Sequence, residues 1–148
     1  MENYSLNQHP DPDARRQAVC ALENRFHPLV RELAIHELKK GVSGGLALGL
    51  FIKNYQDGDE RQIIELAEIP EDADEQHGFF QDVKELLKKN PQADASQLAV
   101  ATYALTPCSF CRNDAAELLR DRQIAPAWLM EECRFDSEPD TRKLFPEP

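Results

Sequence analysis

The sequence predicts an all-α fold, a short right-handed stack of antiparallel helix pairs with about nine helices. Three observations lead to this prediction. A spaced pattern of arginine, small residue and leucine recurs along the chain, no stretch alternates with the period of two that marks a strand, and prolines separate short apolar stripes at helical spacing. We interpret residues 1–148 as a single repeat domain, in which residues 1–10 form a flexible N-terminal tail.

The recurring pattern places an arginine three residues before a small or apolar residue. Its four copies are centred on Arg15, Arg31, Arg112 and Arg142, and in the first three a leucine follows seven residues after the arginine. A proline precedes each copy and suits the first turn of a helix. The small residue and the leucine, one turn apart, suit close packing against a neighbouring helix. The spacing fits two-helix units of about 30 residues, each of which buries the apolar face of the next.

The helices follow in order from their apolar stripes. After the first copy of the pattern, the stripes cover 29–38, 46–55, 63–67, 79–87, 98–105, 115–119 and 128–133, with a last short helix beginning at Pro139. Proline, glycine or asparagine stands in the breaks, and Asp59 is predicted to cap the helix that follows a turn at 56–59. The segment 69–77 is rich in carboxylates and ends at His77, so we interpret it as an irregular, solvated connector.

Two segments carry a resemblance to a known family. The segment 27–41, HPLVRELAIHELKKG, resembles the first half of a HEAT repeat, and the segment 106–145 is similar to a block in small, mostly uncharacterised bacterial HEAT-repeat proteins. The resemblance covers roughly residues 12–145. It implies a curved α-solenoid whose concave surface holds a partner. It also implies an Asp/Arg ladder along the stack, to which Arg15, Arg31, Arg112 and Arg142 would contribute, although the units between 43 and 105 have no matching arginine.

One motif carries reactive side chains, the pair Cys108-x-x-Cys111 after Pro107. The pair opens a helix, where free N–H groups and the helix dipole favour a thiolate. A redox dithiol is one interpretation, although the strand that precedes such a pair in thioredoxin-like folds is missing. A zinc site of Cys108, Cys111, Cys133 and a histidine is another. The third is that Cys111 and Cys133 are small core residues between stacked helices.

Charge and composition limit the classes of partner. Residues 54–100 hold 12 acidic and 4 basic side chains, and the chain carries a net charge of −10. We therefore expect no nucleic-acid partner, because such binding depends on neutralising phosphates. No apolar run approaches the roughly 20 residues of a membrane span, and the N-terminus has neither the basic start nor the apolar centre of a signal peptide. We expect a cytoplasmic protein without a membrane partner.

The function that follows is a non-enzymatic scaffold that binds a protein on its concave surface. The acidic middle segment is compatible with a basic partner. No nucleophile elbow, phosphate loop or dinucleotide fingerprint occurs, and we expect no cofactor. Trp128 is a candidate contact with the partner, because tryptophan is enriched at interfaces, or it packs between helix pairs. The alternative function is thiol redox or zinc-linked activity centred on Cys108 and Cys111.

Overall fold

The computed structural model describes residues 11–39 and 44–146, and within these ranges it contains nine α-helices and no strand. The helices are α1 (Pro12–Leu22), α2 (Pro28–Lys39), α3 (Gly44–Phe51), α4 (Asp59–Leu66), α5 (Ala73–Lys89), α6 (Ser96–Leu105), α7 (Ser109–Asp121), α8 (Ala127–Cys133) and α9 (Pro139–Lys143). The predicted all-α class is thus confirmed for the described residues. The predicted tail at 1–10 lies outside them, and so does Gly41 at the end of the HEAT-like segment 27–41.

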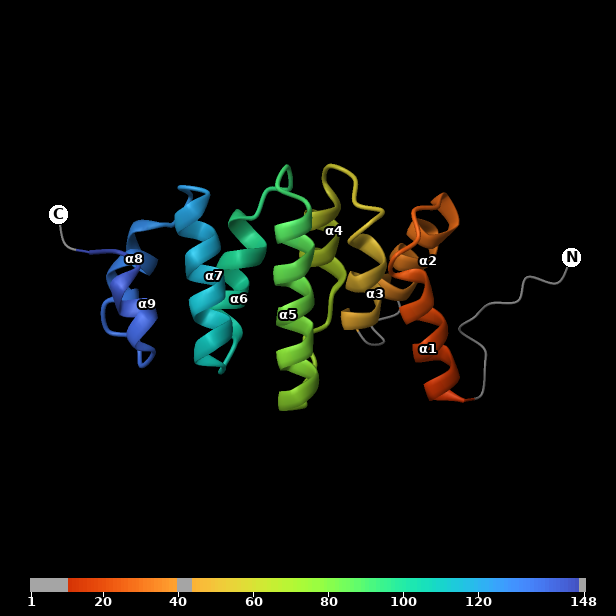
Figure 1. The fold of residues 1–148 in the computed structure, drawn as a ribbon, viewed down its shortest axis with the longest axis horizontal. Helices are drawn as coiled ribbons and strands as arrows, with labels where there is room; N and C mark the ends of the chain where they lie inside the picture. The colour runs from red at the N-terminus through yellow and green to blue at the C-terminus, as the bar shows by residue number, and fades with distance from the viewer. Residues whose placement is uncertain (1–10, 40–43, 147–148) are drawn as a thin grey trace, which may run out of the picture.

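The helices follow one another along the long axis of the molecule, from α1 at one end to α9 at the other (Figure 1). The odd-numbered helices contact each other in series, α1 with α3, α3 with α5, α5 with α7 and α7 with α9. On the other side, α2 contacts α4 and α4 contacts α6. Contacts between α2 and α3 and between α6 and α7 join the two layers. Each helix therefore packs mainly against helices close to it in the chain.

The apolar core lies between the two layers and uses the residues that the recurring pattern singled out. Ala34 and Ala115 are buried, and so are Leu38 and Leu119 one turn later in their helices. Their burial confirms these four packing positions, whereas Ala18 and Leu22 of the first copy are only half-buried. Small side chains let neighbouring helix backbones approach, while each leucine fills the space beside them.

Two helix starts differ from the sequence-based expectation. Gly58, in the left-handed conformation with φ of 95°, precedes α4, so Asp59 is the first helical residue and not the cap. The predicted connector at 69–77 is wrong in its second half, since α5 begins at Ala73. Asp72 caps this helix, because its side chain accepts hydrogen bonds from the backbone N–H groups of Asp74 and Glu75. The carboxylates that suggested a solvated loop therefore stabilise the start of a helix.

Polar side chains at the ends of the odd-numbered helices α3, α5 and α7 bond to the main chain of earlier segments. Asn54 follows α3 and donates to the carbonyl of Arg25, and Asn90 caps α5 and donates to the carbonyl of Ile52, at 2.9 and 3.1 Å. Arg122 caps α7 and donates to the carbonyls of Leu87 and Ala93. These bonds satisfy main-chain groups that would otherwise be orphaned between helices. They fix the spacing between the ends of α3, α5 and α7 and the segments that they contact.

Candidate functional site

Three side chains of the types that bind metals meet where the N-terminal part of α5 faces the start of α7. The ligand atoms of His77, Cys108 and Cys111 all lie within 4.8 Å of one another. Cys111 Sγ lies 3.3 Å from His77 Nδ1. Cys111 is buried, Cys108 is half-buried and His77 is exposed, so the cluster extends from the helix packing to the surface. A buried thiol, a second thiol and an accessible imidazole form one compact donor set.

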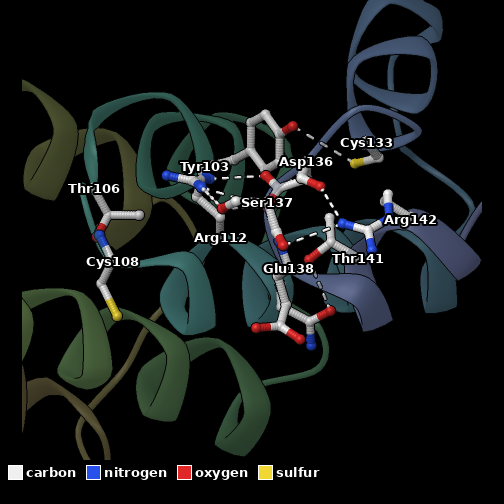
Figure 2. Close-up of polar contacts among 11 residues, drawn as sticks. Tyr103, Thr106, Cys108, Arg112, Cys133, Asp136, Ser137, Glu138, Thr141 and Arg142 are labelled. Carbon is white, nitrogen blue, oxygen red and sulfur yellow. Dashed lines mark hydrogen bonds and ion pairs between the residues drawn. The ribbon is translucent and has the colours of Figure 1, made fainter.

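The start of α7 positions both thiols. Pro107 lies in the short connection between α6 and α7. The backbone N–H of Cys108 donates to the hydroxyl of Thr106 at 3.2 Å. Cys108 is the residue that precedes α7, and Cys111 is the third residue within it. The spacing therefore wraps the two side chains around one helical turn. Figure 2 shows the Cys108 side chain pointing away from the ion pair that Arg112 forms on the other side of this turn.

α5 supplies the remaining groups of the site. His77 and Gln81 are four residues apart, so they lie on one face of the helix. Gln81 Nε2 donates to Cys111 Sγ at 3.3 Å, next to the contact with His77. Sequence reasoning missed both residues, since it placed His77 in a connector. The helix-start signal at Asp72 could have revealed that His77 and Gln81 share a helical face.

The environment of Cys111 favours its neutral form. Burial raises the pKa of this thiol, and the neighbouring Cys108 raises it further, while hydrogen bonds with Gln81 and Thr106 act in the opposite direction. A thiol with a raised pKa is a poor free nucleophile at neutral pH. A metal ion would change this balance, because a coordinated thiol is deprotonated by the charge of the ion.

Cys133 lies outside the cluster. It is buried in α8, where its Sγ contacts the hydroxyl of Tyr103 at 3.7 Å (Figure 2), and burial raises its pKa. This surrounding agrees with the interpretation of Cys133 as a small core residue. Trp128 packs edge-on against the ring of the same Tyr103 with the ring centroids 6.2 Å apart, yet about half of its side-chain surface is exposed. Trp128 thus packs against a neighbouring helix and is still partly exposed to solvent.

Arg31 of α2 forms an ion pair with Asp59 of α4. Its guanidinium contacts both carboxylate oxygens of Asp59, and the second of these bonds measures 2.7 Å. Asp59 is almost fully buried and also accepts from the backbone N–H of Gln56. Arg31 in addition donates to the carbonyl of Asn54. This pair ties α2 to α4 and is of the kind that an Asp/Arg ladder would contain.

Arg112 forms a second pair, between α7 and the turn before α9. It donates to both carboxylate oxygens of Asp136, at 2.9 and 3.4 Å (Figure 2). Burial acts to raise the pKa of Asp136, but the hydrogen bonds from Arg112 and from the Glu138 backbone outweigh it and lower the pKa. Arg142 donates to the carbonyls of Asp136 and Ser137 and so holds the same turn. The fourth predicted arginine, Arg15, lies half-buried on α1.

Between these two pairs a lysine takes the place of arginine. Lys84 on α5 contacts the carboxylate of Asp114 on α7 at 2.5 Å. An ion pair thus also joins α5 to α7, and a search for arginines could not find it.

A polar hollow of about 330 Å³, the acidic hollow, opens on the surface between α4 and α6. It is lined by Glu60, Arg61, Ile64, Glu65, Asp94 and Gln97. Three carboxylates thus face one guanidinium. Glu60 is buried at this site and accepts a hydrogen bond from the hydroxyl of Tyr55. Hydrogen bonds from Ser96 lower the pKa of Asp94, so this carboxylate stays ionised at neutral pH.

Comparison with protein-family models finds no match, and neither curated proteins nor solved structures include a significant match to the chain. The HEAT-like resemblance therefore stays a prediction. Among the helices of residues 11–39 and 44–146, none is both long and apolar enough to cross a membrane.

Proposed function

We propose that the chain is a non-enzymatic protein-binding module of the cytoplasm, a short α-solenoid of HEAT-like repeats that binds a basic segment of a partner protein. The observation that carries this proposal is the acidic hollow between α4 and α6. A stack in which helices contact near neighbours offers a long surface for its size, and such surfaces commonly bind extended partners. The hollow would be part of the concave surface of the solenoid.

The chemistry of the hollow favours lysine or arginine next to an apolar side chain. Glu65 and Asp94 are exposed at its rim, and the buried Glu60 adds negative charge beneath them. Ile64, which is 39% exposed, offers an apolar contact in the same place. Complementary charge mainly raises the association rate and selects the partner, while apolar contact adds affinity. Both kinds of contact are available within one hollow.

The test is a selection from a random peptide library displayed on phage, with the wild-type protein as bait. We expect enrichment of sequences with lysine or arginine next to leucine or a similar apolar residue. Binding of the enriched peptide, followed by fluorescence anisotropy, should weaken as salt is raised, because exposed charges are screened. The double variant Glu65→Lys/Asp94→Lys should weaken binding by about tenfold or more, at up to about 1 kcal/mol for each exposed pair that is lost or reversed.

The matched control is Glu85→Lys on α5, which makes one charge reversal of the same kind in the other layer of helices. We expect this variant to bind the peptide as the wild type does. A selection without basic sequences, or equal affinity for the wild type and the double variant, would show that the hollow is not the binding surface.

A further inference from the structure

The cluster of His77, Cys108 and Cys111 has the donor chemistry of a transition-metal site. Thiolate and imidazole are the ligands that zinc prefers, whereas magnesium and calcium need a shell of oxygen atoms. The three donors come from two helices that are distant in sequence, with Cys111 34 residues beyond His77. Only the fold brings them together.

The distances agree with binding of a single ion. With Zn–S near 2.3 Å and Zn–N near 2.0–2.1 Å, two ligands of one tetrahedral zinc lie roughly 3.6–3.8 Å apart. The contact between Cys111 Sγ and His77 Nδ1 measures 3.3 Å, and the remaining separations within the cluster reach at most 4.8 Å. Shifts of about 1 Å or less would therefore complete the geometry. Rotation of the exposed His77 side chain can supply such a shift without moving a helix.

The surroundings support metal-bound thiolates. Both cysteines lie at the start of α7, where the helix dipole and the free N–H groups favour negative charge. Gln81 donates to Cys111 Sγ and would orient this ligand, as groups outside the ligand set do in known metal sites. On binding, each thiol would release its proton to the solvent.

We propose that His77, Cys108 and Cys111 bind one Zn²⁺, with solvent or a small exogenous ligand in the fourth tetrahedral position. Three protein ligands and one open position are the arrangement of zinc sites that react with a bound molecule, in contrast to closed four-ligand structural sites. This site joins α5 to α7, whereas the acidic hollow lies between α4 and α6. The proposal is thus independent of the protein-binding function.

The experiment measures zinc affinity by competition with a chromophoric chelator, using reduced protein freed of metal. We expect one Zn²⁺ per chain. His77→Ala and Cys108→Ser should each raise the Kd about 100-fold or more, since both remove a ligand. Gln81→Leu should raise it by about 10- to 100-fold, the range found when a group that orients a metal ligand is removed. Cobalt in place of zinc should give the thiolate-to-metal charge-transfer absorption, which should weaken in Cys108→Ser.

Two matched controls change the same residue types elsewhere. Cys20→Ser on α1 and His36→Ala on α2 remove an exposed cysteine and an exposed histidine, and both should bind zinc as the wild type does. Circular dichroism should show unchanged helicity in all variants, because His77 is exposed and Cys108 half-buried. Absence of zinc binding by the wild type would overturn the proposal. Equal affinity in the wild type and in His77→Ala or Cys108→Ser would overturn it as well.

Discussion

We expect the substitution Asp82→Asn to stabilise the protein at neutral pH and to lose this effect as the pH falls. Asp82 is a half-buried residue of α5, and its pKa is raised to about 6. Burial is the largest cause, and the nearby carboxylates of Glu23 and Glu85 add to it. Glu23 lies close against Gly49 of α3, where an added Cβ would be only 2.6 Å from its Oε1. Negative charge is therefore crowded where α1, α3 and α5 meet.

The size of the effect follows from the two pKa values. A shift from 3.8 to about 6 corresponds to about 3 kcal/mol, at about 1.4 kcal/mol per tenfold change in proton affinity. Because Asp82 is only half-buried, screening by water reduces this to on the order of 1–2 kcal/mol. The native state binds the proton more tightly than the unfolded state, so ionisation of Asp82 destabilises the native state as the pH rises between the two values. Above about pH 6 the full penalty applies.

The assay is urea unfolding of the wild type and of Asp82→Asn between pH 4.5 and pH 8, followed by circular dichroism. Asparagine cannot ionise, so the variant should gain about 1–2 kcal/mol at pH 7. The gain should fall to about a third of this at pH 4.5, because the native carboxyl is then protonated and this pH lies only a little above the unfolded pKa of 3.8. Asp57→Asn makes the same change at an exposed turn and serves as the control.

Two results would refute this reasoning. One is an Asp82 carboxyl that titrates near pH 4 in the folded protein when followed by NMR. The other is a gain in stability that stays constant with pH, since it would arise from packing and not from charge. Glu23→Gln gives an internal check on the cause. Removal of its charge should lower the pKa of Asp82 and reduce the benefit of Asp82→Asn in a double-mutant cycle.

Two further predictions concern core packing and the ion pair between α2 and α4. Leu119→Asp should unfold the protein, because it buries a carboxylate in the core, whereas Leu105→Asp at an exposed position of α6 should leave it folded. Thermal unfolding decides this, and an unchanged midpoint for Leu119→Asp would contradict the packing assignment. Arg31→Met should cost about 3–5 kcal/mol, since it leaves the buried Asp59 without its cation. In urea unfolding, the double variant Arg31→Met/Asp59→Asn should be more stable than Arg31→Met alone. An equal loss of unfolding free energy in the two variants would contradict the role of the buried charge.

The helices could be predicted from the sequence because their signals are local. Prolines at helix starts and apolar residues one turn apart act within a single element, and Leu38 and Leu119 are buried as this pattern predicts. The start of α5 was predicted too late, since its apolar stripe begins only at Phe79. The first turn of α5 is held by charge and capping instead. Asp72 and the acidic residues after it were therefore interpreted as a loop.

The candidate metal site could be predicted only in part for the same reason. Cys108 and Cys111 are neighbours in sequence, so their spacing alone suggested a site. The third ligand could not be predicted without knowing which helix lies beside the start of α7. Cys133, the nearest remaining cysteine in the C-terminal block, is instead buried against Tyr103, while His77 comes from α5. Contacts between alternate helices decide such pairings, and local periodicity does not encode them.

Ion pairs with a similar sequence separation recur along the stack of helices although their residues change. Arg31 with Asp59 joins α2 to α4, Lys84 with Asp114 joins α5 to α7, and Arg112 with Asp136 joins α7 to the turn before α9. A pattern based on arginine finds the first and the last of these pairs and misses the lysine between them. In each pair a cationic side chain contacts a carboxylate 24 to 30 residues further along the chain. An arginine makes two directed bonds there, whereas a lysine makes a less directed contact. The middle of the stack therefore has the less rigid joint, and this is also where α5 carries the crowded carboxylates and one side of the proposed zinc site.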